Sequence, residues 1–110
     1  MMTTVHVLTT DGALRRALLG RLERVPEIDR LVTGEADSPP QPRDIVVATA
    51  SDCPTERVAE LATSGVRVII LAAVPREGDR DRYRQAGARA YVPMTVDTAL
   101  LVDAIAQATA

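Results

Sequence analysis

Short apolar runs and longer amphipathic stretches alternate along the first third of the chain. Residues 4–9 are rich in β-branched side chains, which favour a strand. Asp11 follows where a helix N-cap belongs, and leucines then recur at near-helical spacing until Pro26 interrupts the pattern. This order predicts a strand and then an amphipathic helix, and residues 28–33 predict a second short strand.

The stretch that follows, residues 34–43, predicts a loop. It contains Pro39, Pro40 and Pro42. Proline inside a helix removes a backbone hydrogen bond and clashes with the preceding turn. The second and third strands are therefore expected to be joined without a helix.

A strand, a helix and another strand are predicted over residues 44–71. The continuous apolar run in residues 44–50 is typical of a strand buried on both faces. A helix is expected next, with Asp52 as its cap and Pro54 in its first turn, and Gly65 ends it. Residues 66–71 carry the strongest strand pattern of the chain.

Residues 76–86 predict a heavily charged helix. Tyr83 and Ala86 are its only apolar anchors, so we expect it to be loosely held. Gly87 suits a left-handed C-cap. Residues 89–92 then predict a fifth strand, and Asp97 opens a last helix. One face of that helix is expected to carry Leu100, Leu101, Ala104, Ile105 and Ala108.

Alternating strands and helices predict one α/β domain over residues 1–110. Right-handed crossovers between parallel strands place helices on both faces of a sheet. With five strands, we expect a flavodoxin-like, doubly wound parallel sheet of order 2-1-3-4-5, in which the Pro-rich loop replaces the second helix. A chain of 110 residues has room for one hydrophobic core.

Composition excludes several kinds of chemistry. All 13 basic residues are arginine, so no reaction can use a lysine. The single cysteine, Cys53, and the single histidine, His6, cannot form an internal disulfide or a site of several cysteines or histidines. We expect no metal and no other cofactor, and a lone thiol fits a reducing, cytoplasmic setting.

Charge and hydropathy argue against nucleic-acid and membrane partners. The net charge of -2 gives no general attraction to phosphate backbones or anionic lipids. The arginines of the first and third helices are interleaved with acids and predict solvated faces. The longest apolar stretch, residues 66–74, is far shorter than the roughly 20 residues of a membrane span. No signal peptide is visible at the start.

Candidate site residues follow the predicted strands. Open parallel sheets bind ligands beyond the carboxyl ends of the strands, at the point where strand order reverses. Four segments are expected to meet there, namely residues 9–12, 49–52, 72–74 and 93–95.

Several of these segments carry a family resemblance. Residues 66–73 and 87–94, with a Gly-Ala pair and the aromatic Tyr91, resemble the fourth and fifth strands of receiver domains of bacterial response regulators, the CheY-like fold. Residues 44–49 are similar to the third strand of such domains, and residues 8–11 to the acidic turn after the first. The resemblance covers nearly the whole chain and implies a role in two-component phosphorelay signalling.

The chain departs from these receivers wherever they perform phosphoryl transfer. Receivers hold Mg²⁺ with two acids after strand 1, accept phosphate on an Asp ending strand 3, and use a Ser or Thr after strand 4 and a Lys after strand 5. The corresponding residues are Thr10 and Asp11, then Thr49 or, on alignment at Pro54, Ala50, then Ala72, then Met94. The resemblance is therefore to a degenerate, atypical receiver.

Elementary chemistry leads to the same expectation. Mg²⁺ prefers a nearly octahedral set of hard oxygens, and Asp11 alone, with Asp52 engaged as a cap, is a poor site. A hydroxyl such as that of Thr49 needs a neighbouring base to become a nucleophile, and the sequence shows none. We expect neither an aspartyl phosphate nor an enzymatic activity.

Three residues each have two interpretations. Tyr91 is a switching aromatic by resemblance, or a rim residue covering the aliphatic core. Cys53 is a thiol activated near a helix N-terminus, or a small half-buried residue. His6 is a pH sensor, or a partly buried strand residue.

Two hypotheses for function follow. In the first, the resemblance implies a phosphorylation-independent module in signal transduction and transcriptional regulation. It would bind a protein partner or itself, as a homodimer through the last two helices. Such domains often precede a DNA-binding unit, whose linker would begin near Ala110. In the second, Ala72 and Met94 make the emptied acid pocket apolar enough to sense a small molecule.

Overall fold

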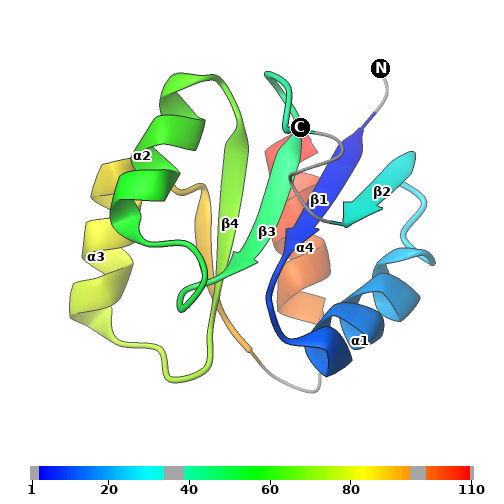
Figure 1. Ribbon diagram of the computed structural model, residues 1–110, viewed down its shortest axis with the longest axis horizontal. Helices are drawn as coiled ribbons and strands as arrows, with labels where there is room; N and C mark the ends of the chain where they lie inside the picture. The colour runs from blue at the N-terminus through cyan, green and yellow to red at the C-terminus, as the bar shows by residue number, and fades with distance from the viewer. Residues whose placement is uncertain (1–2, 34–38, 95–98, 110) are drawn as a thin grey trace.

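A parallel five-stranded sheet organises the molecule (Figure 1). The computed structural model describes residues 3–33, 39–94 and 99–109. Its elements are β1 (Thr4–Leu8), α1 (Gly12–Leu22), β2 (Arg30–Thr33), β3 (Ile45–Thr49), α2 (Thr55–Thr63), β4 (Arg67–Ala72), α3 (Glu77–Ala86), β5 (Ala90–Pro93) and α4 (Ala99–Thr109). The strand order is β2-β1-β3-β4-β5, and every neighbouring pair is parallel. The predicted flavodoxin-like fold and its strand order are confirmed.

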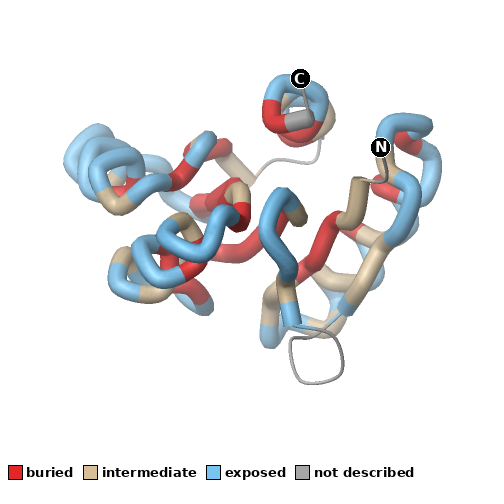
Figure 2. Tube along the Cα trace, turned by 90° about the horizontal axis from the view of Figure 1, so that it is seen from above, coloured by how far each residue is buried: buried red, intermediate tan, exposed pale blue. Residues whose placement is uncertain are grey.

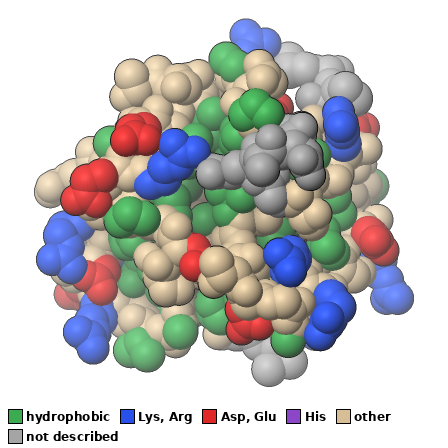
Figure 3. Space-filling model, viewed as in Figure 1, with side chains coloured by type: hydrophobic (Ala, Val, Ile, Leu, Met, Phe, Trp, Pro, Cys, Tyr) green, Lys and Arg blue, Asp and Glu red, His purple; other side chains and the backbone are tan. Residues whose placement is uncertain are grey.

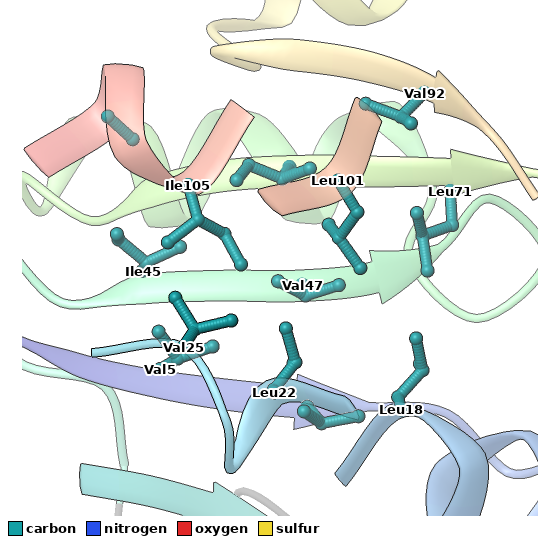
Figure 4. Close-up of a cluster of buried hydrophobic side chains, with 13 residues drawn as sticks. Val5, Leu18, Leu22, Val25, Ile45, Val47, Leu71, Val92, Leu101 and Ile105 are labelled. Carbon is teal, nitrogen blue, oxygen red and sulfur yellow. The ribbon is translucent and has the colours of Figure 1, made fainter. Parts of the chain in front are cut away.

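Helices cover both faces of the sheet, as Figure 2 shows from above. Side chains of successive strand residues point to opposite faces, so each central strand supplies two cores. On one face, Val5, Ile45 and Val47 pack with Leu22 of α1 and Ile105 of α4 (Figure 4). On the other face, a second cluster joins β3, β4 and β5 to α2 and α3. β3 and β4 are buried on both sides, as the continuous apolar run of residues 44–50 predicts for β3.

Two predicted helix ends are confirmed. The carboxylate of Asp11 accepts hydrogen bonds from the backbone N–H groups of Ala13 and Leu14, at 3.0 and 3.1 Å, and so caps α1. Gly87 ends α3 with a φ of 112°, in the left-handed region. A Cβ at Gly87 would lie 2.6 Å from the Cβ of Ala62, so α2 and α3 approach closely there.

Two details of the predicted helices are wrong. Asp52 does not cap α2, whose N-cap is Pro54, because the carboxylate of Asp52 is engaged elsewhere. Leu100 does not share the apolar face of α4, because its side chain is 54% exposed while Leu101 is 3% exposed. Adjacent helical residues point about 100° apart, and with Leu101 facing the core this offset leaves Leu100 turned toward solvent. Asp97, expected to open this helix, lies outside the described residues.

The connection between β2 and β3 differs from a helical crossover in its described part. Residues 39–44 contain a turn at residues 42–43 and otherwise irregular backbone with no helix, and residues 34–38 lie outside the described residues. Asp44, the last residue of this connection, contacts His6. The His6 Nε2 lies 2.9 Å from the Oδ2 of Asp44, and His6 is 1% exposed. His6 is therefore a fully buried residue. Among the described residues, no helix is both long and apolar enough to cross a membrane.

Candidate functional site

The carboxyl ends of the strands lie at one edge of the sheet, where the loops after β1 and β3 run side by side (Figure 1). Strand order reverses at this point. The chain runs from β1 to β2 on one side of β1, and then crosses to β3 on the other side. The predicted site segments after β1 and β3 therefore meet at the position where this fold class binds ligands.

Asp52 ties the two loops together. Its Oδ2 accepts hydrogen bonds from the Thr10 N–H at 3.0 Å and from the Thr49 hydroxyl at 2.6 Å. Its Oδ1 accepts a third from the Thr10 hydroxyl, at 3.0 Å. The side chain that sequence analysis assigned to a helix cap instead joins the loop after β1 to the end of β3.

These hydrogen bonds also set the protonation state of Asp52. The hydroxyl of Thr49, then the backbone N–H of Thr10, hold the pKa of the Asp52 carboxyl below its ordinary value. The carboxylate is ionised at neutral pH and is a weak base. The structure thus places beside Thr49 a carboxylate that sequence analysis assigned to a helix cap, and the lowered pKa makes this carboxylate a weaker base.

Thr49 and Ala50 occupy the two alternative positions for a phosphate acceptor. Thr49 ends β3 with 4% of its surface exposed, and its hydroxyl is committed to Asp52. Ala50 follows the strand and is partly buried, and its carbonyl oxygen lies 3.1 Å from the hydroxyl of Tyr83. Neither position offers a carboxylate.

The ends of β4 and β5 supply apolar side chains. Ala72 is 2% exposed, and its carbonyl oxygen accepts a hydrogen bond from the Met94 N–H at 2.8 Å. The Met94 side chain is partly buried against the core that α1 and α4 cover. The described part of this edge therefore presents no hydroxyl after β4 and no cation directly after β5.

The acidic residues at this edge do not form a metal-binding group. Asp11 caps α1 and Asp52 holds two loops together. Within residues 3–33, 39–94 and 99–109, no three His, Cys, Asp or Glu side chains lie close enough to hold a metal ion. Divalent cations in proteins usually require several oxygen ligands, and the carboxylates described here are already engaged.

A pocket of about 250 Å³ opens between the ends of β1 and β3. It is lined by Val7, Leu8, Thr9, Thr10, Arg15, Asp52, Cys53 and Arg57. Thr9, Thr10 and Asp52 of the predicted site segments line it, while Asp11, Ala72 and Met94 do not. Arg15 was interpreted as part of a solvated helix face, and sequence analysis gave Arg57 no role. Their positions in the first turns of the helices after β1 and β3 are the signal that could have identified them.

Two stacked tyrosines connect the loop after β3 to α3 and β5. The rings of Tyr83 and Tyr91 lie 5.7 Å apart at 26°, and both residues are buried. The Tyr83 hydroxyl lies 2.9 Å from the carbonyl oxygen of Cys53, a residue only 2% exposed. Burial raises the pKa of Tyr83, so its hydroxyl keeps its proton and can donate. Sequence analysis identified Tyr83 only as a packing anchor.

Similar proteins were found by comparison with solved structures. No family model matches the chain, and no curated protein matches it either. A LuxR-family DNA-binding response regulator from Staphylococcus aureus matches with a TM-score of 0.77 at 17% identity, over 99% of this chain and 100% of that one. A response regulator receiver protein from Pseudoalteromonas atlantica also gives 0.77, at 16% identity, over 96% of each chain.

A third structure extends the same likeness. The BeF3-activated DrrB receiver domain matches with a TM-score of 0.75 at 18% identity, over 99% of this chain and 98% of that one. At sequence identities this low, the similarity supports the same fold but not the same site residues. The chain therefore shares its fold with the receiver domains of response regulators.

Proposed function

We propose that the chain is a cytoplasmic receiver-like signalling module that works without aspartyl phosphorylation. The observation that carries this proposal is the end of β3. There the acceptor position is Thr49 or Ala50, and the nearby carboxylate of Asp52 already accepts three hydrogen bonds from Thr10 and Thr49. A phosphoryl group would find no carboxylate at either acceptor position and no lysine in this chain.

Two further structures of the same fold contrast with this chain. They are the response regulator Rcp1 in its Mn(2+)-bound form and the phosphorylated cyanobacterial phytochrome response regulator RcpA, with TM-scores of 0.68 and 0.71. In the present chain Asp11 is occupied as a helix cap, and Ala72 and Met94 bring no polar side chain to the site. Phosphoryl transfer depends on metal ions and fixed cations that neutralise the developing charge, so loss of these groups supports a switch that uses other inputs.

We propose that the module signals by binding another protein. The partner is a second copy of this chain, in a homodimer formed by α3 and α4, or a separate protein. Among the described residues, the large hydrophobic side chains that are exposed are Val74, which precedes α3, and Leu100, in the first turn of α4. Acidic and basic side chains are interspersed on the face shown in Figure 3, which does not favour binding of a nucleic-acid backbone.

Sedimentation velocity at micromolar concentration tests this output. We expect a dimer whose association is unchanged by acetyl phosphate with Mg²⁺, because no site accepts the phosphoryl group. Leu100→Gln should weaken the dimer, whereas Arg16→Gln, an exposed change on α1, should leave it intact. A monomer at every concentration would contradict the homodimer, and association that increases with the phosphodonor would contradict phosphorylation independence.

A second candidate function is sensing of a small molecule, and the pocket between β1 and β3 favours it. The pocket lies where strand order reverses, and Thr10, Asp52 and Cys53 from the two crossing loops line it. A bound ligand would contact both loops that Asp52 joins. Because Tyr83 contacts the carbonyl oxygen of Cys53, occupancy could be transmitted to α3.

A further inference from the structure

Two arginines from different helices line the pocket between β1 and β3. Arg15 belongs to the first turn of α1 and Arg57 to the first turn of α2. Arg57 pairs with Glu60 at 3.0 Å. No carboxylate of the described residues lies within ion-pair distance of Arg15. Two helices thus bring positive charge to one small pocket.

The remaining wall of this pocket is partly apolar. Val7, Leu8 and Cys53 line it, and Cys53 is 2% exposed. Asp52 contributes one negative charge, but the hydrogen bonds to its carboxylate come from Thr10 and Thr49. The lining therefore combines two positive charges, one hydrogen-bonded negative charge and an apolar floor, which suits an anion that carries a hydrocarbon body.

We propose that this pocket binds a small organic carboxylate. Its carboxylate group pairs with Arg15 and Arg57, since guanidinium groups match carboxylate geometry through paired hydrogen bonds. Its hydrocarbon body packs against Val7, Leu8 and Cys53. The inference rests on the second candidate function and names the ligand class for that pocket.

The size of the pocket limits the ligand. An apolar cavity of about 150 Å³ in another protein takes up benzene, and the pocket here measures about 250 Å³. A carboxylate on a body of about four to six carbons fits this space. Larger organic ligands need pockets of roughly 300 Å³ or more.

The test is a titration followed by two-dimensional ¹H–¹⁵N NMR. The probes are 4-methylpentanoate, its neutral amide and inorganic phosphate. We expect saturable shifts of the Thr10 and Cys53 amide signals with the carboxylate, and no saturable shifts with the amide. Arg15→Gln and Arg57→Gln should each weaken binding by about tenfold or more, because each removes a charge-assisted hydrogen bond.

A control variant separates pocket contacts from general charge effects. Arg16→Gln removes the neighbouring charge outside the pocket and should retain the parent affinity. Glu60→Gln removes a carboxylate that competes with the ligand for Arg57, so it should not weaken binding.

Three results would overturn the carboxylate site. They are equal shifts with acid and amide, equal affinity for inorganic phosphate, and shifts of signals away from the pocket. None of them bears on phosphorylation independence, which the reaction with a phosphodonor decides separately.

Discussion

The hydroxyl of Thr49 donates a hydrogen bond to the Oδ2 of Asp52 across 2.6 Å. The same oxygen accepts from the Thr10 N–H, so a single carboxylate holds the end of β3 against the loop after β1. The edge at which receivers accept phosphate is here closed by hydrogen bonds within the protein. Asp52 contributes to structure at this edge, and its lowered pKa makes it a weak base.

Asp52 makes the stability of the protein depend on pH. Because its pKa is lowered by folding, its stabilising contribution is present above the ordinary value of 3.8 and is lost as pH falls through the lowered pKa. Asp52→Asn should therefore reduce the free energy of unfolding at about pH 6 and have a smaller effect at about pH 3. Urea denaturation at the two pH values measures the difference.

Glu60→Gln is the matched control for this measurement, because it also removes an exposed carboxylate but leaves both loops untouched. Its effect should be small at either pH. If Asp52→Asn destabilised the protein equally at both pH values, the hydrogen bonds to the ionised carboxylate would not be the cause.

Tyr83→Phe should loosen the loop after β3. The change keeps the ring stacked on Tyr91 and removes the hydroxyl that contacts the carbonyl oxygens of Ala50 and Cys53. We expect a loss of about 1 kcal/mol in the free energy of unfolding, with faster amide hydrogen exchange in residues 51–53. Tyr91→Phe is the control, since the Tyr91 hydroxyl has no hydrogen bond among the described residues. Equal effects of the two changes would contradict the role of the Tyr83 hydroxyl.

Gly87→Ala and Gly78→Ala should have opposite effects. Gly87 has a φ of 112°, and an added Cβ would lie 2.6 Å from that of Ala62, so we expect a loss of about 2 kcal/mol or more. Gly78, inside α3, has nothing within 4 Å of an added Cβ, so alanine there should raise helix stability by up to about 1 kcal/mol. Thermal unfolding of both variants measures this contrast, and a neutral Gly87→Ala would show that the backbone can relax.

Asp11→Ala tests whether Asp11 serves as a cap or as a remnant metal ligand. Loss of the hydrogen bonds to Ala13 and Leu14 should lower the free energy of unfolding by about 1 kcal/mol. Because the described acidic residues form no metal-binding group, Mg²⁺ should shift the melting temperature of neither parent nor variant. A Mg²⁺-dependent stabilisation present only in the parent would instead identify a metal site at Asp11.

The fold could be predicted from the sequence because its signals are local. A continuous apolar run marked β3 as a strand buried on both faces, residues 66–71 carried the strongest strand pattern, and Asp11 and Gly87 marked helix ends through short-range backbone chemistry. Leu100 was assigned to the wrong face because an apolar residue adjacent to Leu101 fits a helical pattern without facing the core.

The arrangement of the site could not be predicted from the sequence, because it depends on contacts between residues that are far apart in the chain. Asp52 satisfies the sequence rule for a cap, but its partner Thr10 lies 42 positions away and is brought near only by the pairing of β1 with β3. Arg15 and Arg57 look like surface charges in their own helices, and they share a pocket only because α1 and α2 both begin at the edge where strand order reverses.

Intact-mass measurement after incubation with acetyl phosphate and Mg²⁺ tests the central claim most directly. The parent protein should keep its mass, because Thr49 is buried and hydrogen-bonded, Ala50 has no nucleophile and the chain has no lysine. A phosphorylatable receiver run in parallel should gain one phosphate and lose it in acid. A stoichiometric, acid-labile gain of one phosphate by the parent protein would contradict the account.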